Sequence, residues 1–332
     1  MVKIDVRKLI SFGKGSYIIS MPKNWVQKNN LKKGDLISVN DDGFELVLSA
    51  NQEEKKTDAK EISIDAKDKD LGLLKAEIVS SYLDGYDTLN IVFDPNYKEV
   101  PKIKDVIRNL SGLEIMEQTS TRISAKNLIN VNEISIKTII RRMDIITRAM
   151  IEDSILCFRG QCTYESIHHR DVDVNRLYYL GYRVIKHAMK NQRIAKALGF
   201  EPWQLHSDTI MIARLEKIAD SQKRIARYLC TVDLDRTTLP QLESIHTSIS
   251  AAYNEVMKSF YNQDKQIAFK IEMAHKDKVS TCDNFLENYT NTYGTLKKKT
   301  HSNLVAVAKI IENLKATSAE IRNIARIVLC YD

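Results

Sequence analysis

The sequence predicts a multidomain protein: a β-rich N-terminal domain (residues 1–50), a small α/β middle domain (51–131), and an all-α body of two three-helix bundles (132–235 and 236–332). A chain of 332 residues is longer than the chains that usually fold around a single hydrophobic core, so several domains are expected. Its pattern changes from short strand-like runs, to strands alternating with helices, to long amphipathic helices. One helical stretch, MIARLEKIADSQKRIARYL, returns in weaker form as IENLKATSAEIRNIARIVL, with the shared Ile-Ala-Arg endings 99 residues apart, which indicates two similar helical units.

The N-terminal domain is predicted to consist of short strands and tight turns. The runs RKLISF, SYIIS, LISVN and FELVLS are each bounded by Gly, Asp or Pro, and a brief helix is predicted from Pro22 to about Asn30. A unit with so few apolar side chains buries little surface alone, and its strand edges stay unpaired. We therefore expect it to form a homodimer.

Positive charge is concentrated at the start of the chain. Residues Met1 to Lys33 contain eight Lys or Arg and only Asp5 on the acidic side, which equals the net charge of +7 of the whole chain. The other 299 residues therefore balance to zero. A small basic unit on a neutral body is typical of a polyanion-binding domain. The alternative interpretation is a basic surface that serves only solubility.

The stretch GKGSYIISMPKNWVQKNNLKKGD, preceded by Arg7-Lys8, resembles the swapped-hairpin AbrB/SpoVT family of DNA-binding domains. The resemblance implies that two chains interlace and present basic residues to DNA. Arg7, Lys8 and Lys14 fall where it implies DNA contacts, and Lys23 flanks the helix position where the family has paired arginines and this chain has Val26-Gln27. Lysines contact phosphates, so we expect salt-dependent binding with modest sequence preference. The alternative is a domain that only dimerises.

The middle domain follows a polar, charged linker from Asn51 to Lys60. Strand-like runs EISIDA, DTLNIVF, LEIMEQT and TRISAKNLI alternate with the helical run DLGLLKAEIVSSYL and a short helix near Lys102 to Leu110, which indicates a small α/β layer. It contains no phosphate-binding loop, dinucleotide fingerprint or metal spacing. We expect the domain to be a plain spacer or a second dimer surface; the alternative is a ligand site lined by the strand ends and the turn from Tyr82 to Tyr86.

The remaining chain is predicted to form six long helices. Their ranges are 134–158, 164–198 (closed by Gly199 and Pro202), about 207–231, 241–261, 265–293 and 296–330. Short connections make consecutive helices antiparallel neighbours, three in each bundle. Met211, Leu215, Ile218 and Ile225 recur at three- and four-residue steps, so the third helix presents an apolar stripe to other helices.

Paired acidic residues lie on the polar side of these helices. Glu216 and Asp220 stand one turn apart, and like charges at that spacing repel unless a cation lies beside them. Asp171 and Asn175 repeat the spacing, with a neutral amide oxygen in place of the second carboxylate. Arginine or a metal ion could supply the missing positive charge.

RDVDVNRLYYLGYRVI and LEKIADSQKRIARYL resemble the PhoU family of phosphate-signalling regulators, over roughly residues 132–332. Their pairing with an AbrB-like domain resembles archaeal-type PhoU architectures. The resemblance implies a site for a divalent or iron-type metal ion on the first bundle, with Glu216, Asp220, Asp171 and Asn175 as ligands. In the second bundle the corresponding residues are Lys315 and Ala319, which cannot bind metal.

Two alternatives to this metal site remain open. In the first, Asp220 lies on a solvated face and pairs with Lys223 and Arg224. In the second, Glu-x-x-His spacing places two metal ligands on one helix face, as in carboxylate-bridged di-metal enzymes. That spacing occurs at Glu165/His168, Glu243/His246 and Glu272/His275.

Composition bounds the location and class of the protein. The first residues have no apolar core of signal-peptide length, and no run of about eighteen apolar residues occurs, so we expect a cytoplasmic protein without membrane insertion. The five cysteines are predicted to be reduced thiols. We expect a non-enzymatic, DNA-binding transcriptional regulator linked to phosphate uptake or homeostasis. The alternative is a PhoU-type adaptor that acts on a phosphate transporter or sensor protein without binding DNA.

Overall fold

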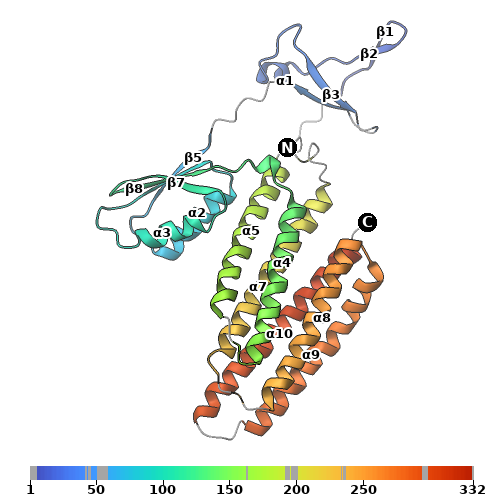
Figure 1. Cartoon of the computed structure of the whole chain (residues 1–332). Coiled ribbons are helices and arrows are strands. Elements are labelled where there is room, and N and C mark those ends of the chain that lie inside the picture. Colours follow the sequence, from blue (N-terminus) through green and yellow to red (C-terminus); the bar gives the residue numbers. More distant parts are fainter. Residues whose placement is uncertain are drawn as a thin grey trace. The chain divides into compact units, whose positions relative to one another are not determined.

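The computed structural model describes residues 6–41, 43, 46–50, 59–161, 164–190, 195, 201–232, 234, 237–293 and 298–330. The chain divides into two compact units, residues 1–59 and 60–332, and each is described by itself (Figure 1). Most of the predicted linker, residues 51–58, lies outside the described residues. Cys162 and Gly199 also lie outside them.

The N-terminal unit consists of two hairpins and one short helix. Its elements are β1 (Ile10–Phe12), β2 (Ser16–Ile18), α1 (Lys23–Lys28), β3 (Ile37–Asp41) and β4 (Leu46–Ala50). β1 pairs antiparallel with β2, and β3 with β4. The first turn holds Gly13 at φ 68°, a left-handed conformation that glycine adopts without steric cost. These elements match the strand-and-turn pattern predicted from the sequence.

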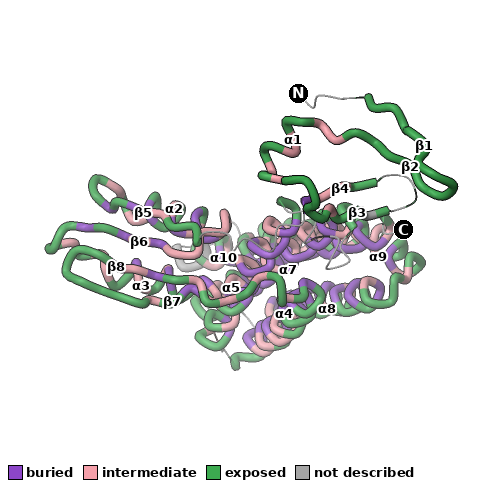
Figure 2. Tube along the Cα trace, turned by 90° about the horizontal axis from the view of Figure 1, so that it is seen from above, coloured by how far each residue is buried: buried purple, intermediate pink, exposed green. Residues whose placement is uncertain are grey.

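This unit lacks a core of its own. Ala50 is the only buried residue among those described in it. Apolar side chains from both hairpins lie at the surface instead, where Figure 2 draws the chain in green. They are Val6, Leu9, Ile10, Phe12, Tyr17, Ile18, Ile19, Leu36, Val39, Leu46 and Val47. Two-stranded hairpins are at best marginally stable alone, so the unit needs a further apolar surface.

The second unit begins with an α/β layer. Its elements are β5 (Glu61–Asp65), α2 (Leu71–Leu83), β6 (Thr88–Val92), α3 (Val100–Arg108), β7 (Leu113–Gln118) and β8 (Arg122–Asn127). The sheet order is β5-β6-β8-β7, with β5 and β6 parallel and the other pairs antiparallel. Asp70 caps α2 by accepting a hydrogen bond of 2.8 Å from the Leu73 N–H. The two helices and the strands enclose one small core.

Six long helices follow a short 3₁₀ turn, η1 (Val131–Glu133). They are α4 (Ile136–Phe158), α5 (Tyr164–Lys190), α7 (Pro202–Leu229), α8 (Thr238–Asn262), α9 (Lys265–Tyr293) and α10 (Lys298–Leu329). α4, α5 and α7 pack together, as do α8, α9 and α10, which gives the two predicted three-helix bundles. None of these helices, as far as their residues are described, is long and apolar enough to cross a membrane.

The two bundles share one hydrophobic core. α7 packs against α10 and α4 against α8, and buried residues from all six helices form one continuous cluster. Met211, Leu215, Ile218 and Ile225 are each 0% exposed, which confirms the apolar stripe predicted on α7. Figure 2 shows the inner faces of these helices in purple.

Two helix boundaries differ from the prediction. α7 begins at Pro202, which was expected to close the preceding helix, and α8 begins at Thr238, before Pro240. Proline lacks an N–H, but the first-turn N–H groups of a helix have no intrahelical partner. Both prolines therefore open a helix at no hydrogen-bonding cost.

Arg183 joins the α/β layer to the helical body. This α5 residue is 3% exposed, donates hydrogen bonds to the carbonyl oxygens of Tyr82 and Tyr86, and lies 4.7 Å above the Tyr82 ring. Lys186 of the same helix pairs with Asp84 at 2.8 Å. The turn from Tyr82 to Tyr86, for which a ligand site was the alternative interpretation, is therefore contacted by side chains of α5.

The cysteines differ in state. Cys230 is disulfide-bonded, so the prediction of a reduced thiol is wrong there. Cys157, Cys282 and Cys330 are thiols. Burial raises the pKa of the Cys282 thiol to about 11, which makes it a packing residue of low reactivity.

Candidate functional site

The residues predicted to contact DNA are all exposed on the N-terminal unit. Arg7 and Lys8 precede β1, Lys14 lies at the tip of the β1–β2 turn, and Lys23 is the first residue of α1. Residues 6–34 contain seven Lys or Arg and no Asp or Glu. No acidic side chain of this segment offsets its charge, so the segment suits contact with a polyanion.

The four predicted metal ligands lie together where α5 packs against α7. Asp171 and Asn175 come from α5, and Glu216 and Asp220 from α7. Asp171 is 5% exposed, and the Asn175 amide donates a hydrogen bond of 3.2 Å to its Oδ2. We call these four residues the acidic cluster.

A lysine occupies the acidic cluster. The Lys223 Nζ lies 2.6 Å from Asp171 Oδ2 and 2.9 Å from Asp220 Oδ1, so it links the two helices. Arg224 binds the other Asp220 oxygen at 2.6 Å. Burial lowers the pKa of Lys223, but hydrogen bonds with both carboxylates outweigh it and raise that pKa above its ordinary value. Asp220 therefore forms the ion pairs with Lys223 and Arg224 that were predicted as an alternative to metal binding.

Glu216 is the carboxylate of the cluster for which the described residues show no ion pair. Burial raises the pKa of its carboxyl, and the charges of Asp220 and Asp171 raise it further. Burial also raises the pKa of the neighbouring Tyr178 and Tyr179 phenols on α5, as does the Glu216 charge. The Glu216 carboxyl is thus partly buried and lies close to two other negatively charged carboxylates.

The acidic cluster does not fit a metal ion in this arrangement. Metal sites direct several carboxylate oxygens at the ion, whereas Asp171 and Asp220 direct theirs at an ammonium group. In the part of the chain that the structure describes, no group of three or more His, Cys, Asp or Glu side chains could hold a metal ion. Metal binding by these residues stays a prediction.

The three Glu-x-x-His motifs do not come together as a metal site among the described residues. Glu243 pairs with Arg159 at 2.7 Å, and Glu272 pairs with Arg326 at 2.7 Å. His246 is 2% exposed and hydrogen-bonds Ser154 and Gln222 in the shared core, with its pKa lowered by burial to about 4. These residues stabilise packing between helices and form no di-metal centre among the described residues.

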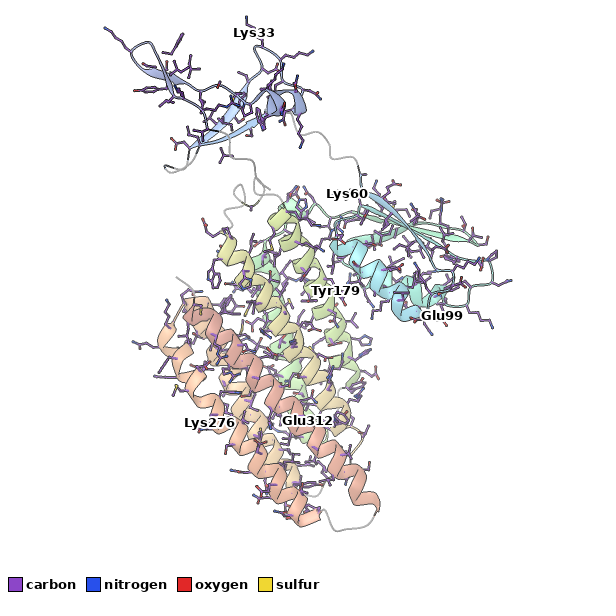
Figure 3. All side chains as sticks on the ribbon, turned by 180° about the vertical axis from the view of Figure 1, so that it is seen from behind. Lys33, Lys60, Glu99, Tyr179, Lys276 and Glu312 are labelled. Carbon is purple, nitrogen blue, oxygen red and sulfur yellow. The ribbon has the colours of Figure 1, made fainter. Side chains whose placement is uncertain are left out.

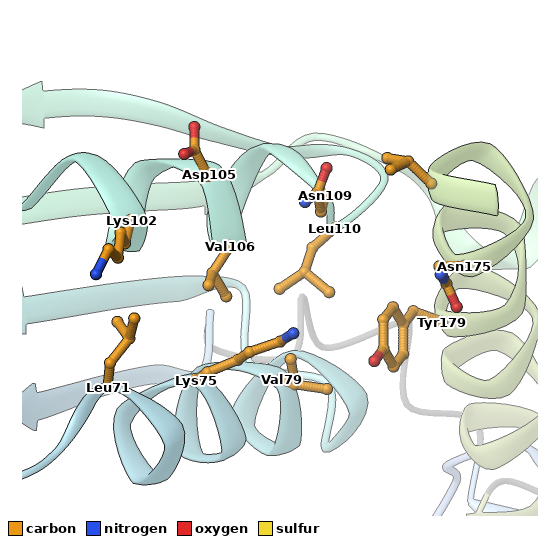
Figure 4. Close-up of a pocket in the computed structure, with 11 residues that line it drawn as sticks. Leu71, Lys75, Val79, Lys102, Asp105, Val106, Asn109, Leu110, Asn175 and Tyr179 are labelled. Carbon is orange, nitrogen blue, oxygen red and sulfur yellow. The ribbon is translucent and has the colours of Figure 1, made fainter. Parts of the chain in front are cut away.

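A cavity of about 450 Å³ lies between α2, α3 and α5 (Figure 4). Leu71, Val79, Val106 and Leu110 form its apolar part. The polar lining residues are Lys75, Lys102, Asp105, Asn109, Asn175 and Tyr179. Figure 4 shows Lys75 extending across the cavity, and Figure 3 shows Tyr179 at this junction. Asn175 and Tyr179 connect the cavity to the acidic cluster, and the mixed lining suits a small polar molecule.

Sequence reasoning missed Arg183 and this cavity. A signal for Arg183 exists in the sequence, since it is a single arginine in the otherwise apolar and aromatic run LYYLGYRVI. The cavity has no local signal, because its lining comes from three helices that meet only after folding. Lys223 was identified in the sequence, but only as a partner for Asp220 and not as the link to Asp171.

Comparison with known proteins finds two similarities. Residues 10–58 match the family described as "Antidote-toxin recognition MazE, bacterial antitoxin". The crystal structure of PhoU from Pseudomonas aeruginosa matches 58% of this chain and 93% of its own, with a TM-score of 0.51 at 15% sequence identity. No curated protein sequence matches the chain. The chain thus combines a MazE/AbrB-like domain with a PhoU-like fold, and both predicted resemblances are confirmed.

Proposed function

We propose that this protein is a non-enzymatic, DNA-binding transcriptional regulator linked to phosphate homeostasis. The observation that carries the proposal is the presence of an exposed basic MazE/AbrB-like domain and a PhoU-like helical body in one chain. The first supplies cations for DNA phosphates. The second has the fold of a family associated with phosphate signalling.

Dimerisation is part of this proposal. The exposed apolar residues of the β1–β2 and β3–β4 hairpins require a partner surface, and a second copy of the same unit offers a complementary one. A dimer also doubles the number of lysines and arginines available to one DNA duplex. In this scheme the helical body responds to phosphate status through a phosphate transporter or sensor protein, and the response alters how the dimer engages DNA.

A salt titration tests DNA binding directly. The full chain and a variant with Arg7→Ala, Lys8→Ala and Lys14→Ala are titrated onto fluorescent duplex DNA at several salt concentrations. Each lost phosphate contact lowers the slope of log affinity against log salt by about 0.9, so the variant should lose about 3 in slope per chain and at least tenfold in affinity.

The matched control removes three exposed lysines from helices of the body, through Lys258→Ala, Lys270→Ala and Lys276→Ala. It changes the net charge by the same amount and should bind as the unchanged protein does. Equal losses in the two variants would show that only overall charge matters and would remove the N-terminal unit from the proposal.

A second candidate function is an adaptor that docks on a phosphate transporter or sensor protein and uses the N-terminal unit only to dimerise. The exposed hairpin side chains favour it, because they require a partner whether or not DNA is bound. Comparing the full chain with a chain lacking residues 1–50 separates the two candidates. A regulator loses DNA binding on truncation, whereas an adaptor shows the same weak binding before and after.

A further inference from the structure

We propose that Lys223 is a built-in cation that closes the acidic cluster to metal ions. Its Nζ lies 2.6 Å from a carboxylate of α5 and 2.9 Å from a carboxylate of α7. A metal ion bridging the two helices would have to take this same position. The side chains of Lys223, Asp171 and Asp220 are 23%, 6% and 26% exposed, so the ammonium is largely shielded from water.

The net charge of the acidic cluster depends on Lys223. The cluster contains the carboxylates of Asp171, Glu216 and Asp220, and two cationic groups, Lys223 and Arg224, contact it. One net negative charge remains. Without Lys223 the net charge would be two negative, which a single divalent ion balances, and the carboxylate and amide oxygens present are ligands that Mg²⁺ and Mn²⁺ prefer.

Tethering favours lysine over a free ion. Lys223 is one turn from Asp220 on α7, so its ammonium is supplied at an effective concentration that a short tether sets in the millimolar range. A metal ion would have to displace both of its charge-assisted hydrogen bonds, and the displaced ammonium would need a new partner or water. A metal ion therefore has to compete with a cation that is always present at the cluster.

The second bundle has a lysine at a position where the first bundle has a carboxylate. The residues 99 positions after Glu216 and Lys223 are Lys315 and Arg322, so a lysine replaces one of the carboxylates there. Lys315 pairs with Asp283 of α9 at 2.6 Å. Both bundles thus join their last helix to its neighbour through a lysine and an aspartate, and the helical body needs no metal ion to hold these helices together.

Manganese binding to the full chain tests the proposal. Calorimetry and electron paramagnetic resonance measure Mn²⁺ uptake by the unchanged protein, by Lys223→Met, and by the control Lys217→Met. Lys217 is an exposed lysine of the same helix that, among the described residues, pairs with Glu320 at 3.8 Å and not with Asp171 or Asp220, so its removal controls for the loss of one positive charge near Glu216. Lys223→Met should bind one Mn²⁺ per chain at least tenfold more tightly than the other two proteins, and adding Asp171→Asn should abolish that gain.

Two results would overturn the proposal. One is stoichiometric Mn²⁺ binding by the unchanged protein that disappears with Glu216→Ala and Asp220→Ala. The other is Mn²⁺ affinity of Lys223→Met no greater than that of Lys217→Met. Circular dichroism checks folding, and Lys223→Gln repeats the test if Lys223→Met does not fold. The comparison of the unchanged protein with the Glu216→Ala and Asp220→Ala variant decides the question without any substitution of Lys223, and none of these results depends on DNA binding.

Discussion

The N-terminal unit and the helical body bury apolar side chains to opposite extents. In the N-terminal unit Phe12 is 65% exposed and Val39 60% exposed, whereas Leu215 and Ile218 of the body are 0% exposed. The body therefore gains its stability within one chain. The N-terminal unit buries little apolar surface within its own chain, so under the proposed dimerisation we expect its folding to be coupled to its association.

The same difference holds for charge. Lys8, Lys14 and Lys23 of the N-terminal unit are exposed and available to an external anion. In the body, Arg183 binds backbone carbonyls and Lys223 binds two carboxylates of the same chain. Cations are thus exposed to solvent in one region and take part in internal packing in the other, although both regions contain the same residue types.

The largest expected effect is on the stability that the helical body gains from its own core. Leu215→Ala leaves a cavity in the shared core and should lower the free energy of unfolding of the body by about 2–5 kcal/mol. Chemical denaturation followed by helical circular dichroism measures this. Val305→Ala, at a position 49% exposed, is the control and should change the value by less than about 0.5 kcal/mol.

A pH effect of intermediate size tests a buried charge of the body. Asp208 is 2% exposed, its Oδ2 has no hydrogen-bond partner among the described residues, and burial raises its pKa from 3.8 to about 6. The folded state therefore binds this proton more tightly than the unfolded state. Stability from this group is complete below about pH 4 and is lost as pH rises through about 6, roughly 3 kcal/mol in all.

Asp208→Asn isolates this contribution. The variant should be more stable than the unchanged protein at pH 7, and this advantage should shrink as pH falls to 4. His246 acts in the opposite direction, because burial lowers its pKa to about 4 and its contribution is lost as pH falls from 6.5. The comparison uses the difference between the two proteins at each pH, in which His246 cancels. A difference that does not vary with pH would contradict the prediction.

The smallest expected effect on the body comes from the N-terminal unit. Phe12→Ala should leave the unfolding free energy of the body within about 0.5 kcal/mol, because Phe12 belongs to the other unit. It should weaken self-association of the chain by at least tenfold, since burying a Phe side chain contributes about 1.5–3 kcal/mol. Sedimentation velocity over a concentration series measures the association. Unchanged association would remove the β1–β2 hairpin from the dimer surface.

Local signals predicted local structure well. The three- and four-residue spacing of Met211, Leu215 and Ile218 predicted their burial, because helical periodicity depends only on near neighbours. The start of α7 was misplaced at about residue 207 because Pro202 suits both the end of one helix and the first turn of the next. The contact of the turn from Tyr82 to Tyr86 with Arg183 has no local signal in the sequence, because Arg183 lies about a hundred residues further along the chain.

The sequence by itself determined the order of the units, the six helices of the body, the basic character of the N-terminal unit, and the two spaced pairs of the acidic cluster. These depend on composition and on spacing within one element. Only the tertiary structure decided which side chains of other elements contact those residues. Lys223 meets Asp171, 52 positions away, only because α5 and α7 pack together, and that contact is the reason that an ammonium group occupies the acidic cluster.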